Sequence, residues 1–390
     1  MYPNLYYAFR DFFGVEWNGL KIVNTFGFVV ALSFLAAAWI LTKELKRKQQ
    51  QGLFQHTDET ITIGAPASFS ELFVNFILGF IFGYKIIGAF TIDDALNDPQ
   101  SFILSARGNA WLGLATGALF CGLKWWEKRK QRLEKPETRT VRIWPHDRVG
   151  DIVIYAAIFG FLGAKIFHNL ENWNEFVKDP WGSLVSFSGL TFYGGLICAG
   201  AAIIYYSRKK NISVIHLCDA TAPAMMLAYA VGRLGCHLSG DGDWGEPNIS
   251  RKPFAWLPDW MWSYKYPHNV LQEGTPIRDC AGQYCNQLPV GVYPTSLYEF
   301  LMCLVLFFVL WSVRKRIKLA GQLSGLYLIF NGMERFFIEQ IRINTKYEFL
   351  PFKPTQAEII SLLLVIAGVV LIVKSKKWFN GETANINRAL

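Results

Sequence analysis

Charged residues are scarce in this sequence. Asp, Glu, Lys and Arg make up 18% of the 390 residues, whereas an average soluble protein carries about 25%. Apolar residues reach 52% and include 14 tryptophans, and they are spread along the whole chain. This composition excludes an ordinary soluble enzyme. It predicts an all-α, polytopic transmembrane helix bundle that forms one integral membrane domain, residues 1–390.

Nine apolar segments are long enough to cross a bilayer, which takes ~20 mainly apolar residues. They lie roughly at residues 18–42, 70–92, 109–126, 149–168, 184–206, 215–236, 297–313, 321–341 and 357–373. We expect no cleavable signal peptide. Arg10, Asp11 and Glu16 precede the first apolar run, and no basic stretch with a small-residue cleavage site is present.

The net charge of +9 is concentrated after every second apolar segment. Basic clusters follow the first, third, fifth, seventh and ninth segments, at residues 43–48, 128–135, 208–210, 314–318 and 374–377. Lys and Arg accumulate in cytoplasmic loops, so this alternation predicts an N-terminus outside and a C-terminus in the cytoplasm. The basic balance therefore marks cytoplasmic loops, and we expect no nucleic-acid partner.

Two stretches of the chain repeat one pattern, because residues 70–126 resemble residues 148–210. Each has a Gly-rich apolar segment with one lysine, Lys85 or Lys165, then a polar turn with Asp-Pro, then an apolar segment that ends in three basic residues. The pattern predicts a duplicated two-helix module with residues 70–126 as an insertion. Chance similarity of two Gly-rich helix pairs is the alternative. Only the second copy carries Phe-Tyr-Gly-Gly, at residues 192–195.

Residues 237–296 form the longest predicted loop, on the outer face. The loop is rich in Trp and Tyr, which favour the headgroup level of a bilayer. Loops of this length usually act as lids or binding platforms. On the oxidising side of the membrane, Cys280 and Cys285 can form a disulfide that closes a short loop, but their spacing alone leaves the pairing open.

Two arginines lie within or at the end of apolar segments, Arg233 and Arg335. Burying a guanidinium in hydrocarbon costs at least ~2.5–3.5 kcal/mol, so each needs a partner or an anionic ligand. Arg335, Glu339 and Arg342 follow i, i+4, i+7 spacing and share one helix face. One carboxylate cannot neutralise two guanidiniums. We therefore expect Arg233 and Arg335 to hold phosphate, and Glu339 to pin neighbouring helices.

The predicted topology brings polar groups of four helices, Tyr193, Arg233, Glu299 and Arg335, to the outer side of the bundle. Nearby glycines permit close helix approach there, and these are Gly194, Gly195, Gly232 and Gly235. The Tyr193 hydroxyl either points at the site or belongs to a packed aromatic ring. With an ordinary pKa near 10, it is a poor general base.

A metal site is the alternative interpretation of the loop after Arg233. His237, Asp241 and Asp243 are possible ligands, but their spacing matches no established ligand pattern, and Gly-Asp repeats are ordinary turn sequences. We therefore predict neither a metal ion nor another cofactor.

Four separated motifs resemble those of the bacterial prolipoprotein diacylglyceryl transferase family. They are FYGGLI at residues 192–197, GRLG at 232–235 with its trailing GDGDWG, YPTSLYE at 293–299 and RFFIEQIR at 335–342. The resemblance implies a multi-pass enzyme of the bacterial inner membrane. It would move the diacylglyceryl group of phosphatidylglycerol to the lipobox cysteine in preprolipoprotein signal peptides. A thioether forms and glycerol-1-phosphate leaves.

The resemblance also implies roles for the candidate residues. Arg233, Arg335 and Tyr193 form the catalytic set, in which the two arginines bind and activate the lipid phosphate. The remaining residues that we assign to substrate binding are Gly194, Gly195, Asp241, Glu299, Glu339 and Arg342. Arginines fixed at this position would stabilise the negative charge that grows on a departing phosphate.

The chain departs from the family pattern at several of these positions. Tyr193 and Tyr293 stand where the family commonly has His, and Cys236 stands where it has Asn. Ser239-Gly240-Asp241 replaces Asn-Gly-Glu, with one extra residue before Trp244. A tyrosinate, Asp241 or the substrate's own environment would then take the thiol proton. The alternatives are another transferase that uses an anionic phospholipid, a lipid transporter and a non-catalytic lipid-binding protein.

Overall fold

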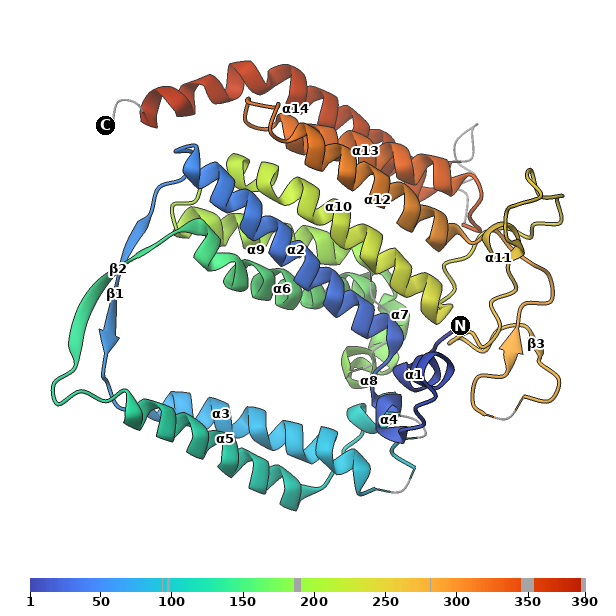
Figure 1. The fold of residues 1–390 in the computed structure, drawn as a ribbon, viewed down its shortest axis with the longest axis horizontal. Coiled ribbons are helices and arrows are strands. Elements are labelled where there is room, and N and C mark those ends of the chain that lie inside the picture. The colour runs from blue at the N-terminus through green and yellow to red at the C-terminus, as the bar shows by residue number, and fades with distance from the viewer. Residues whose placement is uncertain (93, 97–98, 186–190, 281, 345–353, 387–390) are drawn as a thin grey trace.

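The computed structural model describes the chain except residues 93, 97–98, 186–190, 281, 345–353 and 387–390. Helices dominate the fold (Figure 1). The long helices are α2 (Thr25–Gln50), α3 (Phe69–Ile81), α5 (Ala110–Lys130), α6 (Val149–Glu171), α9 (Phe192–Lys209), α10 (Val214–Ser239), α12 (Thr295–Val313), α13 (Gln322–Glu339) and α14 (Gln356–Ile386). The short ones are α1 (Leu5–Phe13), η1 (Asn18–Ile22), η2 (Phe82–Ile87), η3 (Gly88–Phe90), α4 (Pro99–Leu104), η4 (Pro145–Arg148), α7 (Trp173–Lys178), α8 (Pro180–Val185) and α11 (Asp259–Trp262).

Two antiparallel ribbons correct the all-helical prediction. Strand β1 (Thr57–Ile63) pairs with β2 (Glu137–Ile143), so that Thr57 lies opposite Ile143. In the 240–293 region, β3 (Thr275–Pro276) pairs with β4 (Asn286–Gln287). The long ribbon forms because Thr, Ile and Val are frequent in both segments and favour extended backbone.

Among the described residues, helices lie within each of the nine segments that the sequence predicts, and six of them are long and apolar enough to span a bilayer. These six are Thr25–Gln50, Phe69–Phe90, Pro145–Glu171, Val214–Ser239, Thr295–Val313 and Gln356–Ser375. Residues 186–190 of the predicted 184–206 segment lie outside the described residues. Helix α2, in the first predicted segment, begins at Thr25 and not at residue 18, because the Asn24 side chain caps it by accepting a hydrogen bond from the Gly27 amide. The protein is therefore mainly helical, with several helices suited to a membrane.

Helix α10 is the centre of the bundle and packs on α2, α12 and α13. Its buried residues join one hydrophobic core with Leu41 and Leu45 of α2, Ile152 of α6 and Leu310 of α12. The pairs α13–α14 and α6–α9 flank this centre (Figure 1). Most of this core lies toward the end of the bundle where residues 43–48 and 208–210 gather, which we call the basic end.

The opposite end of the bundle carries residues 240–293, and we call it the loop end. A small separate core forms there from Trp244, Tyr266, Leu288 and Val292. Cys280 and Cys285, whose pairing the sequence leaves open, form a disulfide. The disulfide-closed turn contacts α1, where the Tyr284 and Tyr7 rings lie 6.0 Å apart. The polar residues of the candidate site lie between the two cores.

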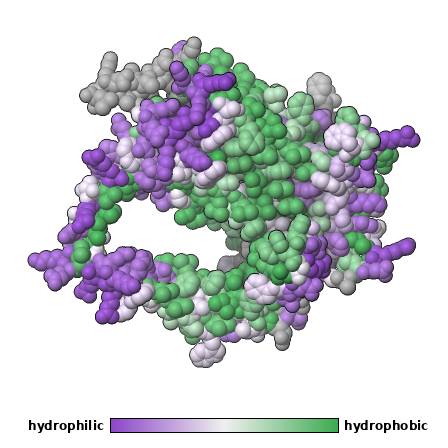
Figure 2. Space-filling view, viewed as in Figure 1, coloured by the Kyte–Doolittle hydropathy of each residue, from purple (hydrophilic) through white to green (hydrophobic). Residues whose placement is uncertain are grey.

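Helices α3 and α5 form a pair that stands apart from the bundle. They pack on each other and on η2, and Figure 2 shows an open space between this pair and the rest of the molecule, with apolar surface around it. The β1–β2 ribbon connects the pair to the basic end through Glu59, which contacts Arg148 and Lys210 at 2.7 and 2.6 Å.

Candidate functional site

The site is built around Glu299, the fifth residue of α12. Its side chain is 0% exposed and pairs with three arginines. Arg233 of α10 approaches with Nε at 2.6 Å from Oε2, Arg335 of α13 with Nη1 at 3.0 Å from Oε1, and Arg342 with Nη1 at 3.4 Å from Oε1. The sequence predicts that Arg233 and Arg335 converge, and the geometry brings them to one carboxylate.

A second carboxylate, Asp243, joins two of these arginines from the loop that follows α10. It pairs with Arg233 and, at 2.6 Å between Oδ1 and Nη2, with Arg342. Burial alone would raise the pKa of Asp243, but the two guanidiniums outweigh it and hold that pKa below its ordinary value. Asp243 therefore remains ionised and ties the loop to α10 and to the end of α13.

Backbone geometry places Asp243 at this position. Gly240 and Gly242 adopt φ angles of +65° and +97°, which favour glycine and reverse the chain directly after α10. The following residues are held by backbone hydrogen bonds from Gly245 N to Tyr293 O and from Glu246 N to Ile341 O, both 2.9 Å. The Gly-Asp repeat thus acts as a turn that carries a carboxylate into the site.

Charges within the cluster balance. Arg335 also pairs with Glu339, with Nη2 at 3.2 Å from Oε2, so three guanidiniums face the carboxylates of Glu299, Glu339 and Asp243. Glu339 alone cannot neutralise both Arg335 and Arg342, and the structure supplies Glu299 and Asp243 as the additional carboxylates. The guanidiniums keep an exposed edge, because the side chains of Arg233, Arg335 and Arg342 are 16%, 21% and 11% exposed. An anionic group can reach them without unfolding the cluster.

The Phe-Tyr-Gly-Gly motif starts α9 and faces two different neighbours. Tyr193 lies within electrostatic range of Arg335 and Glu339. Gly194 and Gly195 instead lie against α6, where a Cβ at Gly195 would come within 2.9 Å of the Gly160 carbonyl oxygen. These two glycines position Tyr193 through close helix packing and do not line the arginine cluster.

The other two glycines proposed to allow close approach differ from each other. A Cβ at Gly235 would lie 3.2 Å from the Val29 side chain, so this residue brings α10 close to α2. A Cβ at Gly232 would meet nothing within 4 Å. Close packing therefore explains Gly235 and does not explain Gly232.

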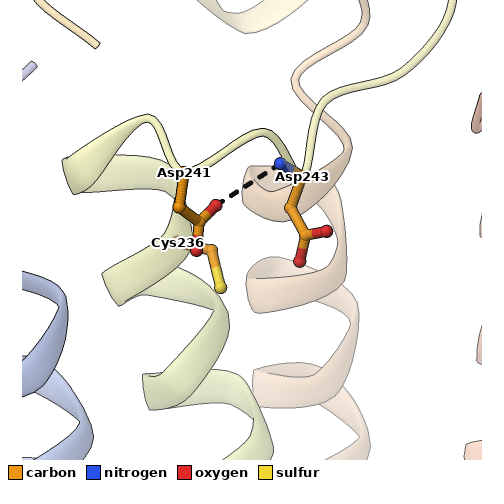
Figure 3. A group of neighbouring side chains, drawn as sticks. All are labelled: Cys236, Asp241 and Asp243. Atoms are coloured by element: carbon orange, nitrogen blue, oxygen red, sulfur yellow. Dashed lines mark hydrogen bonds between the residues drawn. The ribbon is translucent and has the colours of Figure 1, made fainter. Parts of the chain in front are cut away.

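Asp241 lies beside Cys236 and close to Asp243 (Figure 3). Burial, together with the Asp243 carboxylate, raises the pKa of Asp241 above its ordinary value. Its carboxylate accepts a hydrogen bond from the Cys236 thiol and a long one, 3.4 Å, from the Asp243 amide. Two carboxylates separated by one residue thus have opposite environments.

These same three side chains could hold a metal ion by distance alone, since their ligand atoms lie within 4.8 Å of one another. Asp243 is already paired with Arg233 and Arg342, and two guanidiniums beside a ligand repel a cation. His237 does not join the group; its Nδ1 lies 3.3 Å from the Tyr266 hydroxyl in the loop-end core. The arrangement suits an anion better than a cation.

The sequence does not identify two acidic residues of this region as part of the site. It suggests Asp243 only as a possible metal ligand, although the extra residue before Trp244 signals that the loop differs here. Glu334 precedes Arg335 and is 2% exposed, and neither carboxylate oxygen has a hydrogen-bond partner within the described residues. Its signal was a second charge inside a predicted membrane helix.

A sequence model described as prolipoprotein diacylglyceryl transferase matches residues 110–374, more than half of the chain. The chain belongs to this family. The resemblance predicted from four motifs is thereby confirmed, and so is membership of a family of transferases that act in lipoprotein biosynthesis. The match begins in α5, so it includes one helix of the predicted insertion.

Curated relatives named phosphatidylglycerol–prolipoprotein diacylglyceryl transferase differ in how much of the chain they match. One from Leptospira interrogans (strain Fiocruz L1-130) is 25% identical over 414 residues, covering 98% of both chains. One from Staphylococcus aureus (strain MSSA476) is 29% identical over 235 residues, covering 60% of this chain and 76% of the relative. The similarity to the Leptospira protein therefore includes α3 and α5.

Proposed function

We propose that this protein transfers the diacylglyceryl group of phosphatidylglycerol to the lipobox cysteine of preprolipoproteins. The products are a thioether-linked lipoprotein precursor and glycerol-1-phosphate. The observation that carries the proposal is the convergence of Arg233, Arg335 and Arg342 on Glu299 and Asp243, inside a member of the family. No soluble cofactor is needed, because both reacting groups belong to the substrates.

The arginine cluster supplies the electrostatic part of the reaction. When sulfur attacks the glycerol carbon, the carbon–oxygen bond to phosphate breaks and negative charge grows on the leaving phosphate. Arg233 and Arg335 lie beside each other, each with an exposed edge, and would bind that phosphate. Glu299 and Glu339 hold the two guanidiniums in place, and Arg342 ties Glu299 to Asp243. Tyr193 would add a hydroxyl near Arg335.

The proposed topology places this chemistry at the outer leaflet of the bacterial inner membrane. Nine spans with an external N-terminus would put the loop end outside and every basic cluster in the cytoplasm. Helices α3 and α5, residues 70–126, would be an inserted pair in a single membrane domain, and residues 237–296 would form an outer platform for the signal peptide. Cysteine accessibility to a membrane-impermeant reagent tests this: labelling at residue 249 and protection at residue 316 are expected in intact cells.

Complementation tests the function. In a bacterial strain depleted of its own diacylglyceryl transferase, the chain should restore growth and the gel shift of a reporter lipoprotein, with the thioether verified by mass spectrometry. The Arg233→Ala variant, expressed to the same level in the membrane, should fail. Growth without a lipidated reporter would contradict the proposed function, and full lipidation by the Arg233→Ala variant would contradict the role of Arg233 in it.

A further inference from the structure

The proposed transfer releases one proton from the lipobox thiol for each thioether formed, so a nearby group must accept it. Most carboxylates of the site are unsuited to this task. Glu299 is 0% exposed and shared by three arginines, and Glu339 and Asp243 are held in ion pairs. Glu334 is 2% exposed, and the pocket that it borders is otherwise lined by apolar side chains such as Met302 and Phe337. Pairing with a guanidinium weakens a carboxylate as a base, and deep burial leaves little of the Glu334 carboxylate within reach of a thiol.

Asp241 differs from all four. Within the described parts of the chain it takes part in no ion pair, and it is only partly buried. It follows the αL residue Gly240 at the end of α10, so the turn presents its carboxylate beside the last turns of the helix that carries Arg233. A carboxylate that is reachable and free of a guanidinium partner retains its basicity.

The neighbourhood of Asp241 already accommodates a thiol. Cys236 lies beside Asp241 (Figure 3). Its thiol donates a hydrogen bond to the Asp241 carboxylate, and the Cys236 Sγ lies 3.9 Å from Nη1 of Arg233. Sulfur therefore fits between the carboxylate and the guanidinium that would hold the lipid phosphate. The lipobox thiol requires the same two neighbours: a base for its proton and a cation next to the departing phosphate.

We propose that Asp241 is the general base of the transfer. The Asp241 carboxylate takes the proton of the lipobox thiol as the sulfur forms its bond to the glycerol carbon. The carbon–oxygen bond to the phosphate breaks, and glycerol-1-phosphate leaves with the electron pair, stabilised by Arg233 and Arg335. Asp241 then releases its proton to water. This inference rests on the proposed function.

The electrostatic environment agrees with this assignment. The groups that face Asp241 are Asp243 in its own loop, Cys236 and Arg233 on α10, and Tyr266 from the outer loop. Burial and Asp243 raise the pKa of Asp241, and Cys236 and Arg233 oppose them only in part. A carboxylate shifted toward neutral pH is a stronger base than an ordinary aspartate.

The test is the pH dependence of transfer by the full chain in vesicles of phosphatidylcholine and phosphatidylglycerol, with a synthetic lipobox peptide as acceptor. Wild type should show a rate that changes little from pH 7 to 9. Asp241→Asn should be slower at pH 7 by about 10²-fold or more, the usual contribution of a general base. Its rate should then rise about tenfold per pH unit toward the ordinary thiol pKa of about 8.5, as hydroxide replaces the base.

Two variants make the result specific. Asp241→Glu should restore most of the rate at pH 7, because it returns a carboxylate. Asp243→Asn should lose rate equally at every pH, because Asp243 holds Arg233 and Arg342 and takes no proton. If the pH profile of Asp241→Asn is parallel to that of wild type, with or without a uniform loss of rate, then Asp241 is not the general base. The proposed function would still stand. A wild-type protein that forms no thioether at any pH would overturn the proposed function as well.

Discussion

The α3–α5 and α6–α9 pairs have the same construction and different surroundings. In each, two helices run antiparallel and pack closely through glycines, and a short helix that starts at an Asp-Pro sequence lies between them. Lys85 of the first pair donates hydrogen bonds to the backbone oxygens of residue 102 in α4 and of residues 105 and 107 after it. Lys165 is buried at the matching place of the second. This agreement supports the duplication predicted from the sequence, which we retain as a proposal.

The difference lies in what each pair contacts. The α6–α9 pair contributes Val149, Ile152 and Tyr206 to the main core and brings Tyr193 near Arg335. The α3–α5 pair keeps large apolar side chains such as Phe69 and Trp111 exposed, at 82% and 81%. Local sequence therefore specifies a helix pair, whereas contacts with α10 and α13 decide whether that pair belongs to the site. Four predictions test this comparison.

The largest effect is expected when Arg335 is removed, because it is the charged neighbour of Tyr193 in the α6–α9 pair. Arg335→Ala should lower the rate of transfer by about 10²–10³-fold, as for other fixed donors to a developing charge. Rates of thioether formation in phosphatidylglycerol vesicles measure it. Arg129→Ala, at the end of α5, is the control and should leave the rate unchanged. An equal loss of transfer rate in both variants would contradict the conclusion that only the α6–α9 pair contributes to the site.

Glycine packing provides the next test. A Cβ at Gly163 of α6 would come within 2.5 Å of the Gly194 oxygen, and one at Gly79 of α3 within 2.6 Å of the Thr116 oxygen. Valine at either position should destabilise its own pair by about 1–3 kcal/mol. Only Gly163→Val displaces Tyr193, and a displacement of about 1 Å costs about 10²-fold in rate.

Thermal unfolding in detergent and transfer rates separate the two effects of these valine variants. Both melting temperatures should fall, and only the Gly163→Val rate should fall with them. A Gly79→Val protein that folds but has lost transfer would show that the first pair acts on the site.

The helices were predictable from sequence because apolar runs and basic clusters are local signals. The β1–β2 ribbon was not, since its strands are separated by the whole α3–α5 pair and only their pairing makes them a ribbon. The later start of α2 depends on the Asn24 cap, which overrides the apolar character of the residues before it.

Within the site, sequence reasoning found the cations better than their partners. Arg233 and Arg335 are conspicuous because charge in an apolar helix is costly. The partnership of Asp243 with Arg342 depends on a turn at Gly240 and Gly242 and on backbone bonds across almost a hundred residues. No local sequence pattern specifies a contact between residues so far apart in the chain.

A smaller effect is expected from the tyrosine of the second pair. If the Tyr193 hydroxyl donates one hydrogen bond to the charged substrate phosphate, Tyr193→Phe should slow transfer by about tenfold, because such a bond contributes about 1.5 kcal/mol. Trp111→Phe, near the start of α5, is the matched control and should have no effect. Because Tyr193 is near Arg335, its effect should shrink in an Arg335→Ala background. An undiminished loss there would mean that Tyr193 acts independently of Arg335.

The smallest effect is expected from removing the first pair completely. Ile61 and Arg139 lie opposite each other in the β1–β2 ribbon, so an Asn-Gly turn can join them in place of residues 62–138. The shortened ribbon keeps Glu59 and its contacts with Arg148 and Lys210.

This shortened chain should insert in the membrane and transfer at a rate within about threefold of the full chain, because changes remote from a site rarely exceed about 0.5 kcal/mol. Adding Arg335→Ala to it should abolish the remaining activity, which verifies that the same site is measured. Normal membrane levels with no transfer would mean that α3 and α5 take part in substrate access. The α3–α5 pair would then serve substrate access and the α6–α9 pair the transfer itself, so that both pairs would be needed for activity.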